Sequence, residues 1–325
     1  MIYLLGTDEA GYGPNLGPLV VAATLWEVQG EAGDADLYER LKHCVTTKPP
    51  GKKRATNQHV WLADSKVVYQ GGLAALERGV WLALGCAGVQ LKQCADWTQL
   101  WASVCPDAAP QFVDQPWHHP YNEPLPLHHA GTNLSAEVSQ FQAGLKQAGV
   151  RIISMSATVL FPKSFNEKLQ SHTSKGEVLS LATLQLARRM LAGLPEPGPV
   201  LMCSDKHGGR NKYAAYLQHV FDEELIEVCT EGADLSMYRW GQAAARVEAR
   251  FQPRGERFLP VALASMTAKY LREIAMRSFN LYWSTLIPGL PPTAGYPQDA
   301  QRFLASISSH SAYNALPADV LWRLK

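Results

Sequence analysis

Residues 2–14 read Ile2-Tyr-Leu-Leu-Gly-Thr-Asp8-Glu9-Ala-Gly11-Tyr12-Gly13-Pro14, and this stretch decides the fold. Its first six residues are mostly apolar and predict a short strand. The acidic pair follows directly, and the glycines behind it predict a turn. A second β-rich run occupies residues 19–28, so the two runs together predict a hairpin.

Beyond the hairpin, strand and helix patterns alternate. Apolar runs predict strands at residues 150–161, 199–204 and 225–230, and a hairpin over 238–258. Helical spacing predicts helices at 73–84, 177–192, 211–221 and 260–279, and one beginning near residue 298. This order favours an α/β fold with a mixed sheet flanked by helices. Six prolines between residues 105 and 130 predict an irregular insertion rather than core.

Composition excludes several classes of protein. The 325 residues are 46% hydrophobic and 18% charged, with no apolar run long enough to span a bilayer and no signal-peptide pattern. We therefore expect a cytoplasmic protein with no membrane partner. The six cysteines lack the spacing of a zinc site, so we expect reduced, mostly buried thiols. The net charge of +1 leaves a nucleic-acid partner open, because a basic surface can be local.

Carboxylates recur at the predicted strand ends. Asp8 and Glu9 follow the first strand, Asp205 follows the strand at 199–204, and Glu231 or Asp234 follows the next. Magnesium prefers such oxygen ligands, and two ions held by converging carboxylates can catalyse phosphodiester hydrolysis. Each acid taken alone is typical of a solvated loop or a helix cap. Neighbouring strand residues also point to opposite faces, so the first two acids can share a site only if the strand bends or ends there.

Several motifs resemble one family in the same order along the chain. Residues 6–21 resemble the opening of the ribonuclease HII/HIII family, which reads Asp-Glu-Ala-Gly-Arg-Gly-Pro and then Gly-Pro-Val-Val. Asp64-Ser65-Lys66 resembles its Asp-Ser-Lys element, and residues 262–273 are similar to its helix Ala-Ala-Ser-Ile-x-Ala-Lys-x-x-Arg-Asp. Gly295-Tyr296-Pro297 resembles its Gly-Tyr element before a last helix. Expanded regions at 30–60 and 86–140 indicate a divergent member.

The resemblance implies a ribonuclease H-like fold and a metal site. By position, Asp8, Glu9 and Asp205 would bind two Mg2+ or Mn2+ ions. The fourth ligand is open: strand-end position favours Glu231, while identity with the ribonuclease HII pattern favours Asp234. We expect a catalytic domain at 1–280 with an insertion at about 86–140, and a C-terminal helical segment at 281–325 packed on the core.

The resemblance also implies a substrate and its contacts. We expect an endonuclease that hydrolyses the RNA strand of RNA–DNA hybrids, or cuts at ribonucleotides embedded in duplex DNA. Tyr12 stands where the family has an arginine, which leaves the substrate preference open. The residues implied to touch substrate are Gly11, Tyr12, Gly13, Lys66, Ser265, Lys269 and Tyr296.

Other interpretations remain open from the residues alone. Lys269 and Glu273 are spaced to form an ordinary ion pair on an exposed helix face, and Tyr296 is equally suited to packing the last helix. Histidines 118, 119, 128 and 129 are more typical of an exposed insertion than of a metal site. For the whole chain, the alternatives are a nucleic-acid-binding protein that has lost catalysis, or a phosphodiesterase acting on DNA junctions. We expect a monomer.

Overall fold

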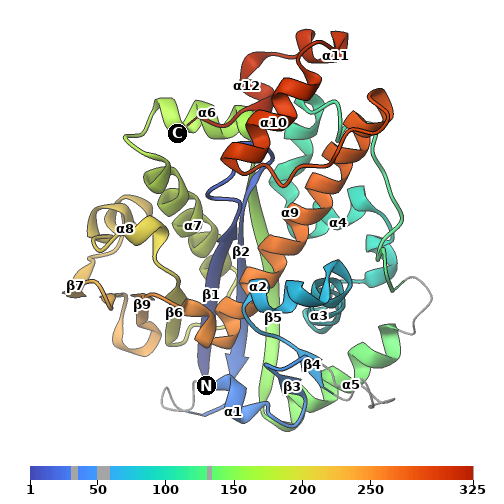
Figure 1. Ribbon diagram of the computed structural model, residues 1–325. Helices are drawn as coiled ribbons and strands as arrows, with labels where there is room; N and C mark the ends of the chain where they lie inside the picture. The colour runs from blue at the N-terminus through green and yellow to red at the C-terminus, as the bar shows by residue number, and fades with distance from the viewer. Residues whose placement is uncertain (31–35, 50–58, 130–133, 325) are drawn as a thin grey trace.

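A seven-stranded mixed sheet forms the centre of the molecule (Figure 1). The computed structural model describes residues 1–30, 36–49, 59–129 and 134–324. The strand order is β5-β2-β1-β6-β9-β8-β7, in which β1 pairs antiparallel with β2 and parallel with β6. The strands are β1 (Ile2–Ala10), β2 (Leu19–Val28), β5 (Val150–Leu160), β6 (Val200–Ser204), β7 (Glu227–Glu231), β8 (Ser236–Trp240) and β9 (Val247–Phe251), with a separate ladder of β3 (Val45–Thr46) and β4 (Val60–Trp61).

The predicted α/β fold with a mixed sheet flanked by helices is confirmed. Strands β6 and β9 are also parallel, so β1, β6 and β9 run in one direction side by side. Thr7 pairs with Ser204, and Ser204 pairs with Phe251. The carboxyl ends of three strands therefore lie level with one another at one edge of the sheet.

Side chains of β1 alternate between two hydrophobic cores. Ile2 and Leu4 join the core beneath the helices α3 (Leu73–Cys86), α5 (Leu134–Gln147) and α9 (Leu259–Leu286). Tyr3 and Leu5 join the core beneath α7 (Lys175–Ala192) and α8 (Ala214–Val220). The long helix α9 crosses over β1 and β2 in Figure 1. The helices are α1 (Leu37–Arg40), α2 (Ser65–Val68), α3 (Leu73–Cys86), α4 (Trp97–Val104), α5 (Leu134–Gln147), α6 (Pro162–Gln170), α7 (Lys175–Ala192), α8 (Ala214–Val220), α9 (Leu259–Leu286), α10 (Pro297–Ile307), α11 (Ser311–Asn314) and α12 (Ala318–Leu321).

The C-terminal helices share a third core with the end of α9. Met276, Phe279 and Trp283 pack there against Phe303 and Ile307 of α10. Because α9 is continuous through residue 280, the expected boundary between the catalytic domain and the C-terminal segment falls inside a helix. The division into these two parts stays a prediction, as do the monomeric state and the cytoplasmic location.

The proline-rich stretch at 105–130 contributes to the core, unlike the insertion we expected. Its Phe112 packs against Trp97 and Trp101 of α4. The expectation that the histidines are exposed is wrong for His118, which stacks on Trp97 with ring centroids 5.2 Å apart. Burial lowers the pKa of His118 to about 3, and Ser278 of α9 hydrogen-bonds its Nδ1 at 2.6 Å.

The cysteines are free, and five of the six are buried. In the described part of the chain, no helix is both long enough and apolar enough to cross a bilayer.

The contact between α9 and β1 depends on Gly6. A Cβ at this position would lie 2.1 Å from the carbonyl carbon of Pro260, in the first turn of α9. We expect Gly6→Ala to destabilise the fold by about 1–3 kcal/mol or more, because backbone on both sides would have to separate. Urea unfolding followed by circular dichroism measures this. Gly193→Ala is the control, since its Cβ would meet nothing closer than 3.5 Å, and equal stability of the two variants would contradict the account.

Candidate active site

Four carboxyl groups gather at the carboxyl ends of the parallel strands. Asp8 and Glu9 lie on β1, Asp205 follows β6, and Glu256 lies in the turn after β9. Glu9 interacts electrostatically with Asp205, and both Asp8 and Glu9 interact with Glu256. Glu256 in turn interacts with Asp205. We call these four residues the acidic cluster.

Burial makes the acidic cluster unfavourable when it is fully charged. Asp8 is only 7% exposed, and burial, with the charge of Glu9, raises its pKa well above the usual range. Burial raises the pKa of Glu9 to about 7, and the charge of Asp205 adds to the effect. Burial also raises the pKa of Glu256. Such a set of acids favours uptake of protons or of a cation.

The donor atoms of the acidic cluster fit a hard divalent cation, since all of them are carboxylate oxygens. Within the described residues, none of the four acids forms an ion pair with a lysine, arginine or histidine. Among the described residues, no group of three acidic, histidine or cysteine side chains is already arranged to hold a metal ion. An ion would therefore have to draw the carboxylates together.

A close backbone contact holds the turn after β9 against Asp205. The backbone N–H of Gly255 approaches Asp205 Oδ1 at 3.4 Å. A Cβ at Gly255 would lie 2.9 Å from the backbone nitrogen of Asp205, so only glycine allows this approach. The contact sets Glu256, the next residue, beside the acids of β1 and β6.

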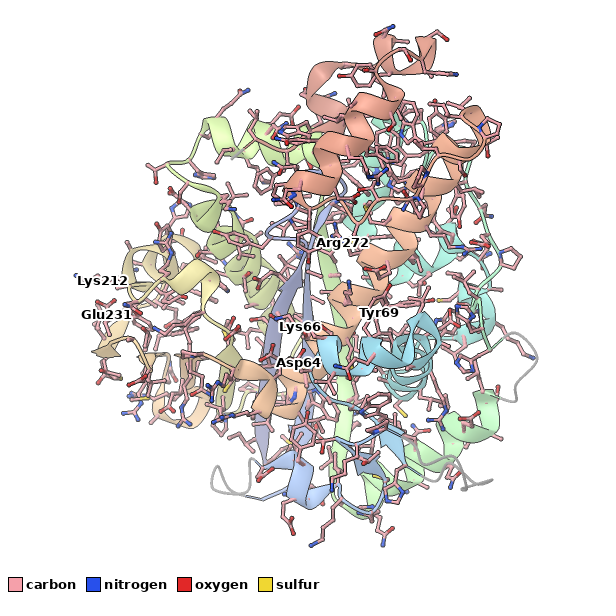
Figure 2. All side chains as sticks on the ribbon, viewed as in Figure 1. Asp64, Lys66, Tyr69, Lys212, Glu231 and Arg272 are labelled. Atoms are coloured by element: carbon pink, nitrogen blue, oxygen red, sulfur yellow. The ribbon has the colours of Figure 1, made fainter. Side chains whose placement is uncertain are left out.

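Serine hydroxyls connect the acidic cluster to the Asp64-Ser65-Lys66 element. Ser265 of α9 hydrogen-bonds Asp8, and its hydroxyl donates to Ser65 Oγ at 2.9 Å. Asp64 caps the start of α2 by accepting from the backbone N–H of Lys66 at 2.8 Å. Figure 2 shows Asp64 and Lys66 at the start of this short helix. The Asp64-Ser65-Lys66 element and α9, about 200 residues apart in sequence, therefore meet beside Asp8.

The glycine turn, residues 11–15, forms a second part of the site. Gly11 has φ +93°, and a Cβ there would lie 2.4 Å from the carbonyl oxygen of Pro18. Gly13 is exposed and faces open space, with only Tyr296 Cε1 near, at 3.7 Å from its ideal Cβ. The ring of Tyr296 is 56% exposed. The structure therefore brings Gly13 and Tyr296 close together at the surface. A substrate contact by either residue stays a prediction.

Two buried arginines support the glycine turn from behind, and sequence reasoning missed both. Arg323 donates to the backbone carbonyls of Gly11 and Pro14, while Arg272 donates to the carbonyl of Ala294 at 2.9 Å. Burial lowers the pKa of Arg323 to about 9, and the charge of Arg272 lowers it further. Figure 2 shows Arg272 on α9, above Lys66 and Asp64. The turn carbonyls are thereby held inside the protein.

Tyr12, which departs from the family pattern, turns toward the loop after β6. Its hydroxyl would lie 2.8 Å from a Cβ at Gly208. The ammonium of Lys175, at the start of α7, stands 4.5 Å from the centroid of its ring. Burial and then the charge of Glu9 raise the pKa of Tyr12. A cation therefore lies beside position 12 although the arginine is absent.

Lys269 takes part in a local ion pair. Its Nζ lies 2.5 Å from Glu273 Oε1 and 4.5 Å from the ring centroid of Tyr69. The Tyr69 hydroxyl also donates to Glu273, at 2.9 Å. The sequence left this Lys–Glu pair open as an alternative, and the structure contains it. A phosphate contact by Lys269, like one by the exposed Lys66, stays a prediction.

The structure places Glu231 away from the acidic cluster, whereas Asp234 lies near Lys206, the residue after Asp205. Strand β7 lies four positions from β1, roughly 19 Å at about 4.8 Å per strand. Glu231 accepts instead from the Tyr238 hydroxyl at 2.6 Å, and Figure 2 shows it at the outer edge of the sheet. Asp234 is exposed and attracts the ammonium of Lys206. Glu256 lies beside the acids of β1 and β6 because β9, not β7, is the neighbour of β6; which of these acids bind metal, Asp234 included, stays a prediction.

No known family model matches the chain, and no curated protein matches it in sequence. Solved structures are similar over nearly its whole length. They include the PCNA:RNase HII complex from Archaeoglobus fulgidus (14% identity, 99% of this chain, 92% of that chain, TM-score 0.43) and ribonuclease H2 from Pyrococcus horikoshii OT3 (15%, 98%, 92%, 0.43). Bst-RNase HIII in complex with Mn2+ matches at 16% identity, 99% of this chain, 66% of that chain and TM-score 0.41. These similarities are weak, and the function proposed below rests on residues of this chain.

Glu9 is expected to make stability depend on pH. Its folded pKa of about 7 lies above the ordinary 4.5, so between these values the folded protein holds a proton that the unfolded chain has lost. The contribution of Glu9 to stability therefore falls as pH rises from about 4.5 through 7, by roughly 1.4 kcal/mol per pKa unit. Urea unfolding of the wild type and of Glu9→Gln across this range measures the difference.

Glu9→Gln should gain stability relative to the wild type with rising pH in metal-free buffer, and added Mg2+ should reduce that gain. Comparing the two proteins cancels the titration of groups remote from Glu9, including the buried histidines, and leaves that of Glu9 and its neighbour Asp8. A pH-independent difference between them would contradict the raised pKa.

Proposed function

We propose that the protein is a metal-dependent endonuclease of the ribonuclease H type. The observation that carries the proposal is the gathering of Asp8, Glu9, Asp205 and Glu256 at one edge of the parallel strands, where each is at least partly buried and none forms an ion pair among the described residues. A purely structural role does not explain four such carboxyl groups, because their mutual repulsion destabilises the folded chain. Hydrolysis of a phosphodiester assisted by divalent metal explains them.

The carboxylates would hold Mg2+ or Mn2+, and two bound ions supply water activation and stabilisation of the leaving oxygen. The chain itself orients the acids. Ser265 and Ser65 fix the position of Asp8, and Gly255 fixes Asp205 against the turn that carries Glu256. Without a cation, the acids would repel the phosphates of a nucleic acid, so substrate and metal should bind together.

The glycine turn would select the sugar. The open space before Gly13 and the exposed ring of Tyr296 lie together at one end of the site. Backbone groups there can contact a ribose 2′-hydroxyl, the group that separates RNA from DNA. We therefore propose that the substrate is the RNA strand of an RNA–DNA hybrid or a ribonucleotide within duplex DNA. Tyr12, turned toward Gly208, would act through the shape of the turn rather than as a phosphate ligand.

Cleavage of an end-labelled RNA–DNA hybrid with Mg2+ or Mn2+ tests the proposal. We expect Asp8→Asn, Asp205→Asn and Glu256→Gln each to reduce kcat by more than the roughly 10–100-fold that loss of an outer-shell partner costs. Glu231→Gln is the matched control and should keep wild-type activity, since Glu231 lies at the far edge of the sheet. Circular dichroism confirms that each variant is folded.

The outcome separates the competing functions. Undiminished cleavage by the cluster variants would exclude the acidic cluster as the active site. Tight hybrid binding without turnover at any metal concentration would identify a nucleic-acid-binding protein, and cleavage of DNA-only junctions alone would identify another phosphodiesterase.

A further inference from the structure

An open hollow of about 550 Å3 adjoins the acidic cluster. Glu256 of the cluster and Asp64 of the α2 cap both line it, so the hollow continues the site. Arg254 and Arg257 line it from the turn between β9 and α9, and Tyr38 faces them from α1. Arg254 and Arg257 therefore lie in the same chain turn as Glu256, one of the proposed catalytic carboxylates.

The two arginines are exposed and have no carboxylate partner among the described residues. Nearby arginines behave differently. Arg239 of β8 and Arg250 of β9 both bind Glu248, at 2.8 and 2.7 Å. The turn that follows β9 therefore carries two guanidinium groups that form no ion pair within the described residues, and both line the hollow.

Backbone strain at Arg254 points to a role for its side chain. With φ +61° and ψ +45°, Arg254 is the one non-glycine residue in the described ranges with a left-handed backbone. This conformation costs an arginine roughly 1 kcal/mol or more, and glycine would adopt it at little cost. Gly255, beside it, cannot carry a side chain because Asp205 is too close. The turn therefore keeps an arginine at a strained position, and this arginine lines the hollow.

We propose that this hollow binds the nucleotide next to the one cleaved, with Arg254 and Arg257 holding its phosphate. The proposal rests on the proposed nuclease function. Guanidinium groups suit phosphate oxygens, which they can bind through two parallel hydrogen bonds. The two guanidinium groups would also offset the repulsion between the phosphates of the incoming strand and the neighbouring carboxylate of Glu256. Tyr38 and Val67 supply an apolar wall for the sugar.

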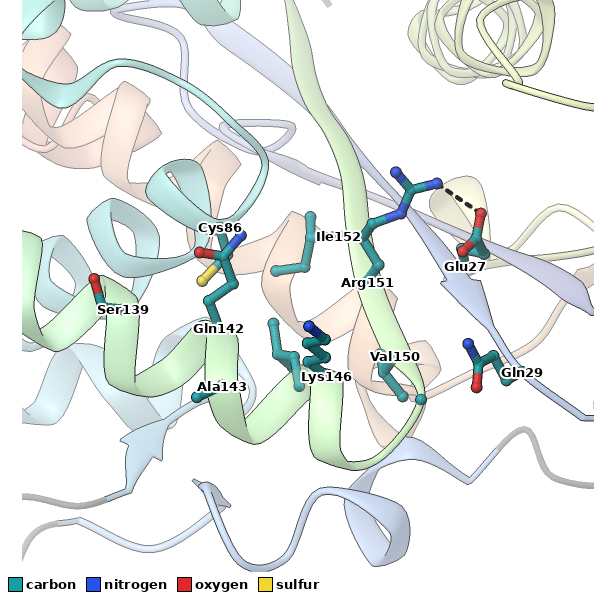
Figure 3. A pocket seen from close by; sticks show the side chains of 12 residues that line it. Glu27, Gln29, Cys86, Ser139, Gln142, Ala143, Lys146, Val150, Arg151 and Ile152 are labelled. Carbon is teal, nitrogen blue, oxygen red and sulfur yellow. Dashed lines mark hydrogen bonds and ion pairs between the residues drawn. The ribbon is translucent and has the colours of Figure 1, made fainter.

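A second hollow, of about 520 Å3, lacks these features (Figure 3). It lies between α5 and the end of β2, where Arg151 is already paired with Glu27 at 2.7 Å. Glu27 pairs with Tyr3 in the sheet, five residues from Asp8, or roughly 17 Å along the strand. Arg151 therefore serves as a control: it is an exposed arginine in a hollow remote from the acidic cluster.

Arg254→Gly separates the charge of the side chain from the strain of the backbone. Glycine keeps the left-handed turn at lower cost, so we expect unchanged or higher stability in urea unfolding. The binding probe is a fluorescently labelled RNA–DNA hybrid with Ca2+, followed by anisotropy between about 50 and 200 mM salt. We expect a several-fold weaker Kd, and a plot of log affinity against log salt that is shallower by about 1, the signature of one lost phosphate contact.

Arg257→Gln should behave in the same way, Arg254→Lys should recover most of the salt slope, and Arg151→Ala should bind as the wild type does. Variants of both turn arginines that bind with wild-type affinity and salt slope would overturn the nucleotide subsite while leaving the nuclease function intact. A wild-type protein that neither binds nor cleaves the hybrid would overturn the nuclease function and the subsite together.

Discussion

The parallel pairing of β1 with β6, and of β6 with β9, sets the position of every acid in the cluster. Parallel strands end at the same edge, so residues that follow them meet even when they are far apart in sequence. Asp8, Asp205 and Glu256 are about 50 to 250 residues apart, yet the register Thr7–Ser204–Phe251 aligns the three strand ends. The helix α9 can cover this edge only because Gly6 lets its first turn contact β1 directly.

The aligned strand ends concentrate negative charge, and arginine and lysine side chains lie around them. Arg323 and Arg272 lie buried behind the glycine turn, Lys175 lies beside Tyr12, and Arg254 and Arg257 line the hollow beside Glu256. The net charge of the whole chain is only +1, so no excess of basic residues signals this pattern. Under the proposed function, a nucleic acid would meet acids that need a metal and, beside them, the exposed Arg254 and Arg257, which favours binding in one register.

Sequence patterns could predict the first hairpin, most helices and three of the four acids, because apolar periodicity and a contiguous motif report local structure. They could not predict Glu256. The strand after β6 in sequence is β7, but the hairpin of β8 and β9 turns back, so that β9 takes the place beside β6. Spatial order in a sheet depends on long-range pairing, which one sequence does not display. The buried arginines were missed for the same reason, since Arg323 meets Gly11 across 312 positions.

Within the described residues 105–129, the prolines predicted neither the 3-10 helix Pro106–Asp114 nor the burial of the stretch, as His118 on Trp97 demonstrates. A segment without strands or α-helix is buried when its aromatic side chains pack into the core. The spacing of its prolines does not predict whether they do.

A crystal structure of the protein soaked with Mn2+, with the ions located from their anomalous scattering, tests the central claim most directly. The account predicts manganese bound by Asp8, Glu9, Asp205 and Glu256, with Glu231 still bonded to Tyr238. Manganese coordinated by Glu231 or Asp234, or no manganese at the ends of β1 and β6, would contradict it.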